Sequence, residues 1–563
     1  MKVIIVGGVA GGATAAARIR RLDEHAEITV FERSGYISYA NCGLPYYIGD
    51  VITDPEELTL QTPESFFKRF RINMKIHHEV ISIHPERKTV SVKNLENGEI
   101  FEENYDKLIL SPGAKPTQPR LPGVGMDKLF TLRTVEDTFR IKEYINKNHP
   151  KSAVLAGGGF IGLELAENLR ELGMDVTIVQ RPKQLMNPFD PDMASMIHNE
   201  MRKHGIKLVL GYTVEGFKEK DNGVEVLLKD NPSLQADMVV LAIGVTPDTA
   251  LAKEAGLELG IKGSIVVNDR METSVPDIYA AGDAVQVKHY VTGDDALISL
   301  AGPANKQGRI IADNICGGDS RYLGSQGSSV IKVFDMTAAT TGINETNAKK
   351  SGLDVDTVIL SPMSHAGYYP GGKVMTMKVV FEKETYRLLG AQIIGYEGVD
   401  KRIDVLATAI HAGLKATQLK DLDLAYAPPY SSAKDPVNMA GFMIDNIAKG
   451  TLKQWHLEDM DKISKDKSVV LLDVRTVGEF NRGHMDGFRN IPVDELRERI
   501  NEIEKGKPVY LICQSGLRSY IASRILEGNG YETYNFSGGF RFYDAVVNDR
   551  VLIERAYACG MDY

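Results

Sequence analysis

The stretch that decides the fold opens the chain and reads Lys2-Val3-Ile4-Ile5-Val6-Gly7-Gly8-Val9-Ala10-Gly11-Gly12. A β-branched run typical of a buried strand leads into the glycines, and an Ala-rich segment running towards Arg20 follows them. A second strand is expected to end at Phe31 and Glu32. This order of strand, glycine loop, helix and strand predicts a dinucleotide-binding unit.

The first glycine loop predicts an FAD site. Glycines let the backbone approach a pyrophosphate, the helix N-terminus supplies N–H donors, and a carboxylate after the second strand accepts hydrogen bonds from a ribose. Val9 stands where the middle glycine of G-x-G-x-x-G is expected, so the loop alone is also compatible with a tight turn. The residues assigned to FAD are Gly7, Ala10, Gly11, Gly12 and Glu32.

The same order recurs from Lys151, where a strand to Ala156 leads into Gly157-Gly158-Gly159-Phe160-Ile161-Gly162. This loop fits G-x-G-x-x-G completely and predicts a second dinucleotide, NADH or NADPH, bound through Gly157, Gly159, Phe160 and Gly162. After the next strand, Gln180 offers no carboxylate to a 2′-hydroxyl, while Arg181 tolerates a 2′-phosphate. The sequence therefore leaves the choice of nicotinamide open.

Two later segments support the FAD assignment: Ser111-Pro112-Gly113 and Tyr279-Ala280-Ala281-Gly282-Asp283. With the two glycine loops, they make residues 1–448 resemble the two-dinucleotide flavoprotein disulfide reductases. The resemblance implies that Gly282 and Asp283 bind the ribityl and phosphate region of FAD. It also implies that Glu164 contacts the nicotinamide, although an acid on a helix surface is the alternative for Glu164.

Cys42 lies in the run Ser38-Tyr39-Ala40-Asn41-Cys42-Gly43-Leu44-Pro45-Tyr46-Tyr47-Ile48-Gly49. Dithiol members of the superfamily carry a second cysteine where this chain has Tyr47. A single thiol is oxidised to a sulfenic acid, a persulfide or a mixed disulfide with an outside thiol. The run resembles the coenzyme A disulfide reductase motif, which implies that the outside thiol is coenzyme A. A small buried hydrophobe is the alternative for a lone cysteine.

Coenzyme A carries phosphates, so basic groups are expected near Cys42. Arg18 and Arg21 lie one turn apart on the first helix. Taken alone they indicate a solvated helix face. The family resemblance instead places them around coenzyme A, together with Ser38, Asn41 and Lys306.

Residues 325–449 predict an α+β dimerisation domain. The runs 365–371 and 426–430 resemble segments from which two tyrosines of this family reach across a homodimer to the other copy's cysteine, and the matching residues are Tyr368 and Tyr426. A phenol can donate a proton to a departing thiolate. The alternative is a pair of ordinary interface aromatics. If the two tyrosines act on the other copy's cysteine, a monomer is expected to be inactive.

The last stretch, from Trp455 onwards, has the motif spacing of rhodanese domains between Leu472 and Pro492. A strand then runs into Cys513-Gln514-Ser515-Gly516-Leu517-Arg518-Ser519. Loop N–H groups and Arg518 are expected to surround the sulfur with positive potential, which favours a thiolate. Arg518 follows Cys513 by five positions, as in sulfur-transfer members of the fold rather than its phosphatases. Cys513 is therefore predicted to carry a persulfide; an inactive regulatory module is the alternative.

The predicted fold class is α/β, with two Rossmann-like domains, an α+β dimerisation domain and a C-terminal rhodanese domain. The predicted boundaries are 1–150 with 238–324 for a split FAD domain, 151–237 for NAD(P), 325–449 for dimerisation and 455–563 for rhodanese.

Composition excludes several classes of function. A net charge of -9 over 563 residues argues against a nucleic-acid partner. The four cysteines show neither zinc spacing nor a disulfide framework, which fits a cytoplasmic protein without a metal site; Cys316 and Cys559 match no motif and are predicted to be structural. No run of about 20 apolar residues occurs, so neither secretion nor membrane insertion is expected.

Together these motifs predict an enzyme that reduces coenzyme A disulfide, coenzyme A persulfide or polysulfide with NAD(P)H through Cys42, while Cys513 handles sulfane sulfur. The chain resembles the coenzyme A disulfide reductases fused to rhodanese, also described as NADH-dependent persulfide reductases. One alternative is an NADH oxidase or peroxidase that cycles Cys42 through a sulfenic acid. Another is a thiosulfate sulfurtransferase whose flavoprotein part senses redox state.

Overall fold

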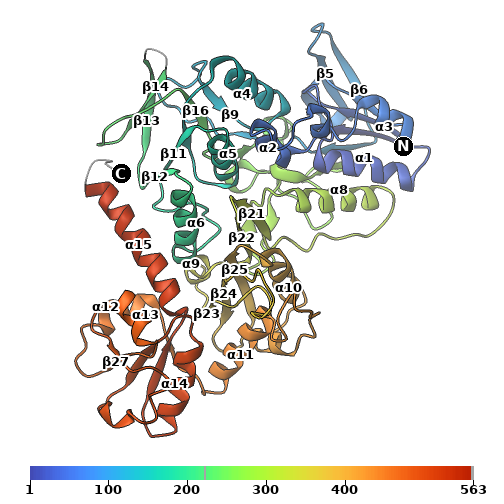
Figure 1. The fold of residues 1–563 in the computed structure, drawn as a ribbon. Helices are drawn as coiled ribbons and strands as arrows, with labels where there is room; N and C mark the ends of the chain where they lie inside the picture. Colours follow the sequence, from blue (N-terminus) through green and yellow to red (C-terminus); the bar gives the residue numbers. More distant parts are fainter. Residues whose placement is uncertain (221–222, 559–563) are drawn as a thin grey trace. The chain divides into compact units, whose positions relative to one another are not determined.

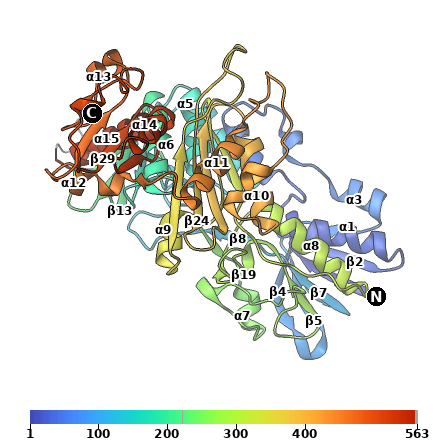
Figure 2. The same ribbon diagram turned by 90° about the horizontal axis from the view of Figure 1, so that it is seen from below.

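The computed structural model describes residues 1–220 and 223–558, with side chains up to Glu554 (Figures 1 and 2). The chain forms two compact units. Met1–Arg181 and Gly205–Gly327 make the first unit, while Pro182–His204 and the residues from Ser328 onwards make the second.

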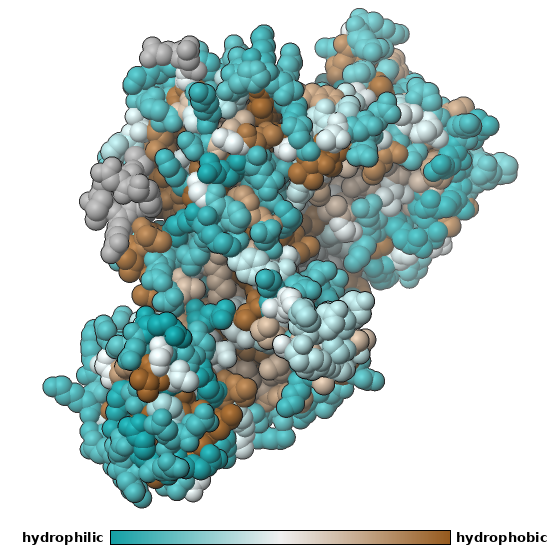
Figure 3. Space-filling view, viewed as in Figure 1, coloured by the Kyte–Doolittle hydropathy of each residue, from teal (hydrophilic) through white to brown (hydrophobic). Residues whose placement is uncertain are grey.

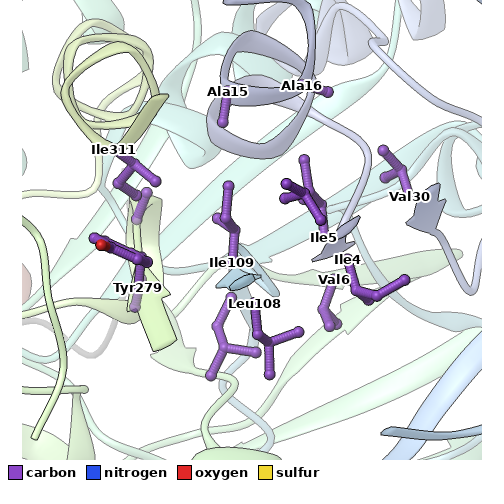
Figure 4. Close-up of a cluster of buried hydrophobic side chains, with 14 of the residues drawn as sticks. Ile4, Ile5, Val6, Ala15, Ala16, Val30, Leu108, Ile109, Tyr279 and Ile311 are labelled. Atoms are coloured by element: carbon purple, nitrogen blue, oxygen red, sulfur yellow. The ribbon is translucent and has the colours of Figure 1, made fainter. Parts of the chain in front are cut away.

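In the first unit, the strand that leads into the first glycine loop is the central strand of a five-stranded parallel sheet. Helices α1 (Ala10–Leu22) and α8 (Ala301–Ile315) pack together on one face of it, over the apolar cluster drawn in Figure 4. Four of these strands are mostly apolar and buried, because both faces of a parallel sheet are covered, and the short edge strand Asn73–Lys75 is more polar. In sheet order the strands are β18 (Ile278–Ala280), β7 (Lys107–Leu110), β1 (Lys2–Val6), β2 (Glu27–Phe31) and β3 (Asn73–Lys75).

A second five-stranded parallel sheet carries the second glycine loop, which leads into α5 (Phe160–Glu171). Two of its strands, β16 and β9, lie in segments that the sequence assigned to the FAD domain. A short apolar run reads the same for either sheet, and only long-range pairing decides between them. In sheet order the strands are β12 (Lys207–Leu210), β11 (Asp175–Gln180), β10 (Ser152–Ala156), β16 (Met238–Leu241) and β9 (Leu129–Thr131).

The first unit also contains two antiparallel three-stranded sheets. Their strands are β4 (His78–His84), β5 (Thr89–Asn94) and β6 (Ile100–Asn104) in one, and β13 (Val214–Lys220), β14 (Gly223–Leu228) and β15 (Leu234–Ala236) in the other.

The second unit combines an antiparallel sheet with a parallel one. Helices α10 (Val399–His411) and α11 (Pro436–Ala448) follow the antiparallel strands. That sheet consists of β21 (Ser329–Val333), β22 (Met336–Gly342), β25 (Leu388–Gly395), β24 (Met375–Glu382) and β23 (Val355–Leu360). The parallel sheet consists of β26 (Gln454–Trp455), β30 (Thr533–Phe536), β29 (Val509–Ile512), β27 (Val470–Asp473) and β28 (Arg489–Asn490), with helices α13 (Val477–Arg482), α14 (Leu517–Glu527) and α15 (Gly539–Ala558).

Residues 182–204, which the sequence assigned to the second nucleotide unit, pack with the second compact unit because buried charges hold them there. The ammonium of Lys378 is 1% exposed and lies 3.2, 2.7 and 2.7 Å from carboxylate oxygens of Asp190, Asp192 and Glu345. Asp190 also accepts a hydrogen bond from Gln392 at 2.6 Å. A buried ammonium is tolerated only when carboxylates surround it in this way.

Helix α6 (Pro191–Lys203) is joined to α15 by a second buried charge cluster. The Oδ2 atom of Asp549 lies 2.8 Å from Nδ1 of His198, and Arg202 donates to Oδ1 at 2.5 Å. Burial alone raises the pKa of Asp549, but the bonds and charges of His198 and Arg202 outweigh it and hold the pKa below its usual range.

Figure 3 shows a mainly hydrophilic surface on the face it displays, with hydrophobic residues scattered among polar ones. Among the described residues, no helix combines the length and apolar character required to cross a membrane.

Replacing Asp549 by Asn leaves the partly buried Arg202 without its counter-ion and is expected to lower the free energy of unfolding by about 3 kcal/mol. Because the folded pKa of Asp549 is depressed, its stabilisation is complete above the unfolded pKa and is lost as the pH falls through the folded one. Chemical denaturation measures both effects. Asp544→Asn, exposed on the same helix, is the control and should change stability by less than about 0.5 kcal/mol. Equal stability of the two variants would contradict the role of the cluster.

Candidate active site

The first glycine loop is held by contacts that exclude side chains. A Cβ on Gly7 would lie 2.1 Å from the carbonyl oxygen of Ser111, and one on Gly12 would lie 1.9 Å from that of Gly7. The backbone N–H of Gly8 donates to Oε2 of Glu32 at 2.8 Å. The carboxylate therefore stands directly beside the N-terminus of α1, where Val9 provides no side-chain cap. An uncapped helix start beside a glycine turn and a carboxylate fits an adenine dinucleotide such as FAD.

The carboxyl ends of strands β1, β7 and β18 bring the other predicted FAD residues close to the first glycine loop. A Cβ on Gly11 would lie 2.7 Å from Oγ of Ser111 and 3.4 Å from Cβ of Ala281. Gly282 donates its N–H to Oε1 of Gln307 at 2.7 Å. Asp283 accepts a 2.6 Å bond from Nη2 of Arg133. Arg133 was missed by the sequence analysis because it belongs to no local motif.

The second glycine loop repeats the geometry of the first. A Cβ on Gly157 would lie 2.2 Å from the carbonyl oxygen of Ala242, and one on Gly162 would lie 2.2 Å from that of Gly157. A Cβ on Gly159 would meet no atom within 4 Å, so a ligand can approach the backbone there. The N–H of Gly158 donates to Oε1 of Gln180 at 3.1 Å, as Gly8 donates to Glu32. At this position the first loop has the carboxylate of Glu32, and the second loop has the neutral amide of Gln180.

Cys42 lies between these two nucleotide regions. It belongs to a short turn, Asn41–Gly43, and is exposed just before α2 (Leu44–Ile48), which packs on α5. Partial burial raises the pKa of the thiol, the negative charges of Glu164 and then Asp283 raise it further, and Arg133 opposes them. The thiol is therefore within electrostatic reach of one predicted residue from each nucleotide site.

Tyr47 occupies the position where dithiol relatives carry a second cysteine. Its ring packs edge-on against Phe139, with the ring centroids 5.6 Å apart. At the end of α2, a Cβ on Gly49 would lie 2.0 Å from Oδ1 of Asn168. The close packing of α2 on α5 fixes the short turn that carries Cys42 beside the second glycine-loop helix.

Glu164 is a partly buried acid on α5. Burial, and then the charge of Glu167, raise its pKa to about 7. A carboxyl that titrates near neutral pH beside a thiol can control the charge that the thiol experiences.

The predicted coenzyme A residues lie on three neighbouring elements. Arg18 is paired with Asp313 of α8 at 2.8 Å, so a phosphate would compete with that carboxylate. Arg21 and Lys306 are exposed on α1 and α8. Ser38, with a φ of 45°, donates its N–H to the carbonyl oxygen of Gly8. Asn41 begins the turn that carries Cys42.

Tyr368 and Tyr426 come together in the second unit. Their hydroxyl oxygens are 2.6 Å apart, and their side chains are 76% and 46% exposed. The hydrogen bond to Tyr368 raises the pKa of Tyr426. The two phenols are therefore joined by a hydrogen bond in which either hydroxyl can be the donor, and both are exposed.

The Cys513 loop forms a second thiol site in the same unit. Cys513 is buried, and its sulfur accepts hydrogen bonds from the N–H of Gly516 at 3.1 Å and the hydroxyl of Ser519 at 3.2 Å. Arg518 donates two bonds to the carboxylate of Glu479, at 2.7 and 2.8 Å, and remains close enough for the Cys513 sulfur to act on its charge. Glu479 belongs to the rhodanese motif spacing, but its pairing with Arg518 was not predicted, because 39 positions separate the two residues.

One further cysteine is described by the structure. Cys316 is a free, partly exposed thiol, and Cys559 lies outside the described residues. Within residues 1–220 and 223–558, no group of three or more His, Cys, Asp or Glu side chains is placed to hold a metal ion.

Two glycine-loop nucleotide units, a lone thiol between them and an appended thiol loop define a two-dinucleotide oxidoreductase with a sulfur-handling domain. The chain belongs to the pyridine nucleotide-disulphide oxidoreductase family, which matches residues 1–308. The dimerisation domain of that family matches residues 328–436, and a rhodanese-like domain matches residues 456–545. The predicted fold class and family are confirmed.

Three relatives are similar over most of the chain. Coenzyme A disulfide reductase of Staphylococcus aureus is 39% identical over 443 residues, which are 78% of this chain and 99% of that protein. The crystal structure of reduced Bacillus anthracis CoADR-RHD has 48% identity and a TM-score of 0.95, covering 98% of both chains. An NAD-dependent persulfide reductase from A. fulgidus has 39% identity and a TM-score of 0.90, covering 96% of this chain and all of that one.

Replacing Glu164 by Gln removes a negative charge near Cys42 and is expected to lower the pKa of this thiol. The measurement is the pH profile of alkylation of Cys42 by iodoacetamide, followed by peptide mass spectrometry. The profile should shift to lower pH, and the difference from the wild type should vanish well below pH 7, where Glu164 is itself protonated. Glu171→Gln, exposed on the same helix, is the control. A profile that does not shift would show that Glu164 does not act on the thiol.

Proposed function

We propose that the chain reduces coenzyme A disulfide, coenzyme A persulfide or polysulfide at Cys42 with electrons from NADH or NADPH, and that Cys513 carries sulfane sulfur. The observation that carries the proposal is the exposed lone thiol of Cys42 between two glycine loops, with Tyr47 packed where a second thiol would stand. The names of the three relatives agree with this substrate class.

For the cofactors we propose FAD at the first loop, held by Gly7, Ala10, Gly11, Gly12 and Glu32, with Gly282 and Asp283 at its ribityl and phosphate region. NADH or NADPH is proposed at Gly157, Gly159, Phe160 and Gly162, with Glu164 towards the nicotinamide. The geometry of the two glycine loops described above supports both assignments. When bound, the nicotinamide supplies hydride and the flavin passes two electrons to sulfur.

The role of Cys42 follows from thiol–disulfide exchange. Its thiolate attacks one sulfur of coenzyme A disulfide, forming a Cys42–coenzyme A disulfide and releasing the other coenzyme A as a thiol. Two electrons then cleave the S–S bond of the mixed disulfide, which returns Cys42 to the thiolate and releases the second coenzyme A as a thiolate. We place Arg18, Arg21, Ser38, Asn41 and Lys306 around the coenzyme A.

The tyrosines and the last domain complete the scheme. We propose a homodimer in which the hydrogen-bonded pair Tyr368 and Tyr426 gives a proton to the departing coenzyme A thiolate at the other copy's cysteine. The N–H of Gly516 and the hydroxyl of Ser519 support a sulfane-sulfur carrier at Cys513. The free thiols of Cys42, Cys316 and Cys513 agree with a cytoplasmic location.

Steady-state assays of the full chain test the scheme. Cys42→Ser is expected to lower NAD(P)H consumption with coenzyme A disulfide and with coenzyme A persulfide by about 1000-fold or more, because the attacking sulfur is gone. Cys513→Ser should leave the disulfide reaction intact and slow the persulfide reaction. Cys316→Ser is the matched control and should change neither.

Three outcomes would contradict the scheme. NAD(P)H consumption that persists only with oxygen or peroxide would support the oxidase reading, and sulfur transfer from thiosulfate without any NAD(P)H consumption would support the sulfurtransferase reading. Equal persulfide rates in the wild type and Cys513→Ser would remove Cys513 from turnover. Mass spectrometry of the purified protein should also find coenzyme A attached to Cys42.

A further inference from the structure

The carboxylate of Glu479 forms a forked ion pair with the arginine of the Cys513 loop. It accepts both bonds of a forked pair from Arg518 and also accepts the N–H and hydroxyl of Thr476, at 3.0 and 2.8 Å. The pKa of Glu479 is lowered to about 2, and the hydrogen bonds from Arg518 are the largest cause of this shift. The pair therefore stays charged throughout the working pH range. A bidentate pair of this kind occupies the fork of donors that would otherwise face an anionic substrate.

The second arginine near the loop is neutralised in the same manner. Arg475 lies 3.5 Å from Oε1 of Gln514 and donates to Oδ2 of Asp473 from Nε at 2.9 Å and from Nη2 at 2.6 Å. Both members of this pair are buried. The two arginines and the two carboxylates are therefore neutral as a set, although the loop motif alone indicates a cationic site.

The loop retains enough polarity for one negative sulfur. The N–H of Gly516 and the hydroxyl of Ser519 both point at the sulfur of Cys513. Apolar side chains are exposed at the start of the two helices that carry the ion pair, since Val477 and Leu517, the first residues of α13 and α14, are 52% and 61% exposed. An organic thiol arm suits such a surface, whereas the thiosulfate dianion is better met by a cation without a carboxylate partner.

The sulfur donors differ in the charge they bring. With a persulfide R–S–SH, the Cys513 thiolate attacks the terminal sulfur, the S–S bond breaks, and its electron pair leaves on R–S⁻ while Cys513–S–SH forms. With thiosulfate, the same attack gives Cys513–S–S⁻ and releases sulfite, which takes the electron pair of the broken bond and carries two negative charges. The second reaction gathers three negative charges around the loop, and like charges in proximity repel one another.

We propose that Glu479 determines the specificity of the Cys513 site: by holding Arg518 in a forked pair, it selects persulfide sulfur carried on an organic thiol and rejects the inorganic dianion thiosulfate. This inference rests on the proposed role of Cys513 as a sulfane-sulfur carrier. Glu479 acts through Arg518 and is a positioning residue.

Glu479→Gln is the sharpest variant, because Gln can replace Glu in the capping box with Thr476 while it removes the charge that holds Arg518. The full chain is assayed for thiocyanate formation from cyanide, with thiosulfate or coenzyme A persulfide as donor. The kcat/KM for thiosulfate is expected to rise about tenfold or more, and that for the persulfide to change by less than about threefold. The proposal is overturned if the ratio of kcat/KM for thiosulfate to kcat/KM for the persulfide is the same in Glu479→Gln as in the wild type.

Two matched variants separate specificity from structure. Thr476→Ala removes the cap hydroxyl but keeps the carboxylate on Arg518, and Glu495→Gln removes an exposed carboxylate that pairs with Arg499. Both should keep the wild-type donor ratio. If either changes the ratio as much as Glu479→Gln does, the effect is not specific to the forked pair and the proposal fails.

The wild type gives a measurement that needs no variant at Glu479. Its kcat/KM for the persulfide should exceed that for thiosulfate by about 100-fold, and a preference for thiosulfate overturns the inference while leaving Cys513 as a carrier. Cys513→Ser should abolish transfer from both donors. Equal transfer by wild type and Cys513→Ser, or no transfer by either, overturns the carrier role and this inference with it.

Discussion

The close approach of a helix to the loop before it is the constraint on which the nucleotide region depends. At Gly12 and Gly162 an added Cβ would lie about 2 Å from the carbonyl oxygen of Gly7 and Gly157, so no larger residue fits either turn. The two turns place uncapped helix starts at the carboxyl ends of two parallel sheets. The position of Cys42, within electrostatic reach of Glu164 and Asp283, follows from this shared geometry.

The two thiols are prepared in different ways. Cys42 is exposed, and the acids around it disfavour its charged form, so its reactivity depends on the charges in neighbouring sites. Cys513 is buried and receives two hydrogen bonds from its own loop. The first thiol is thus sensitive to what binds around it, while the second is prepared by local backbone geometry.

The sequence predicted what is encoded locally. The glycine loops, the Cys42 run and the Cys513 loop are continuous segments, and the glycine loops and the Cys513 loop lie between the predicted strands and helices. The contacts that it did not predict join distant segments: Arg133 with Asp283, Arg518 with Glu479, and β16 with β10. A single arginine or a short apolar run carries no signal of its distant partner, and only the folded chain supplies it.

The buried cluster of His198, Arg202 and Asp549 has a consequence for the history of the two-part chain. Since the last long helix provides the counter-ion for a helix encoded more than 300 residues earlier, deletion of the C-terminal domain is not a neutral event for what remains. A descendant that lost the domain would need compensating changes at positions 198 and 202. A truncation before α15 would leave His198 and Arg202 without their shared carboxylate.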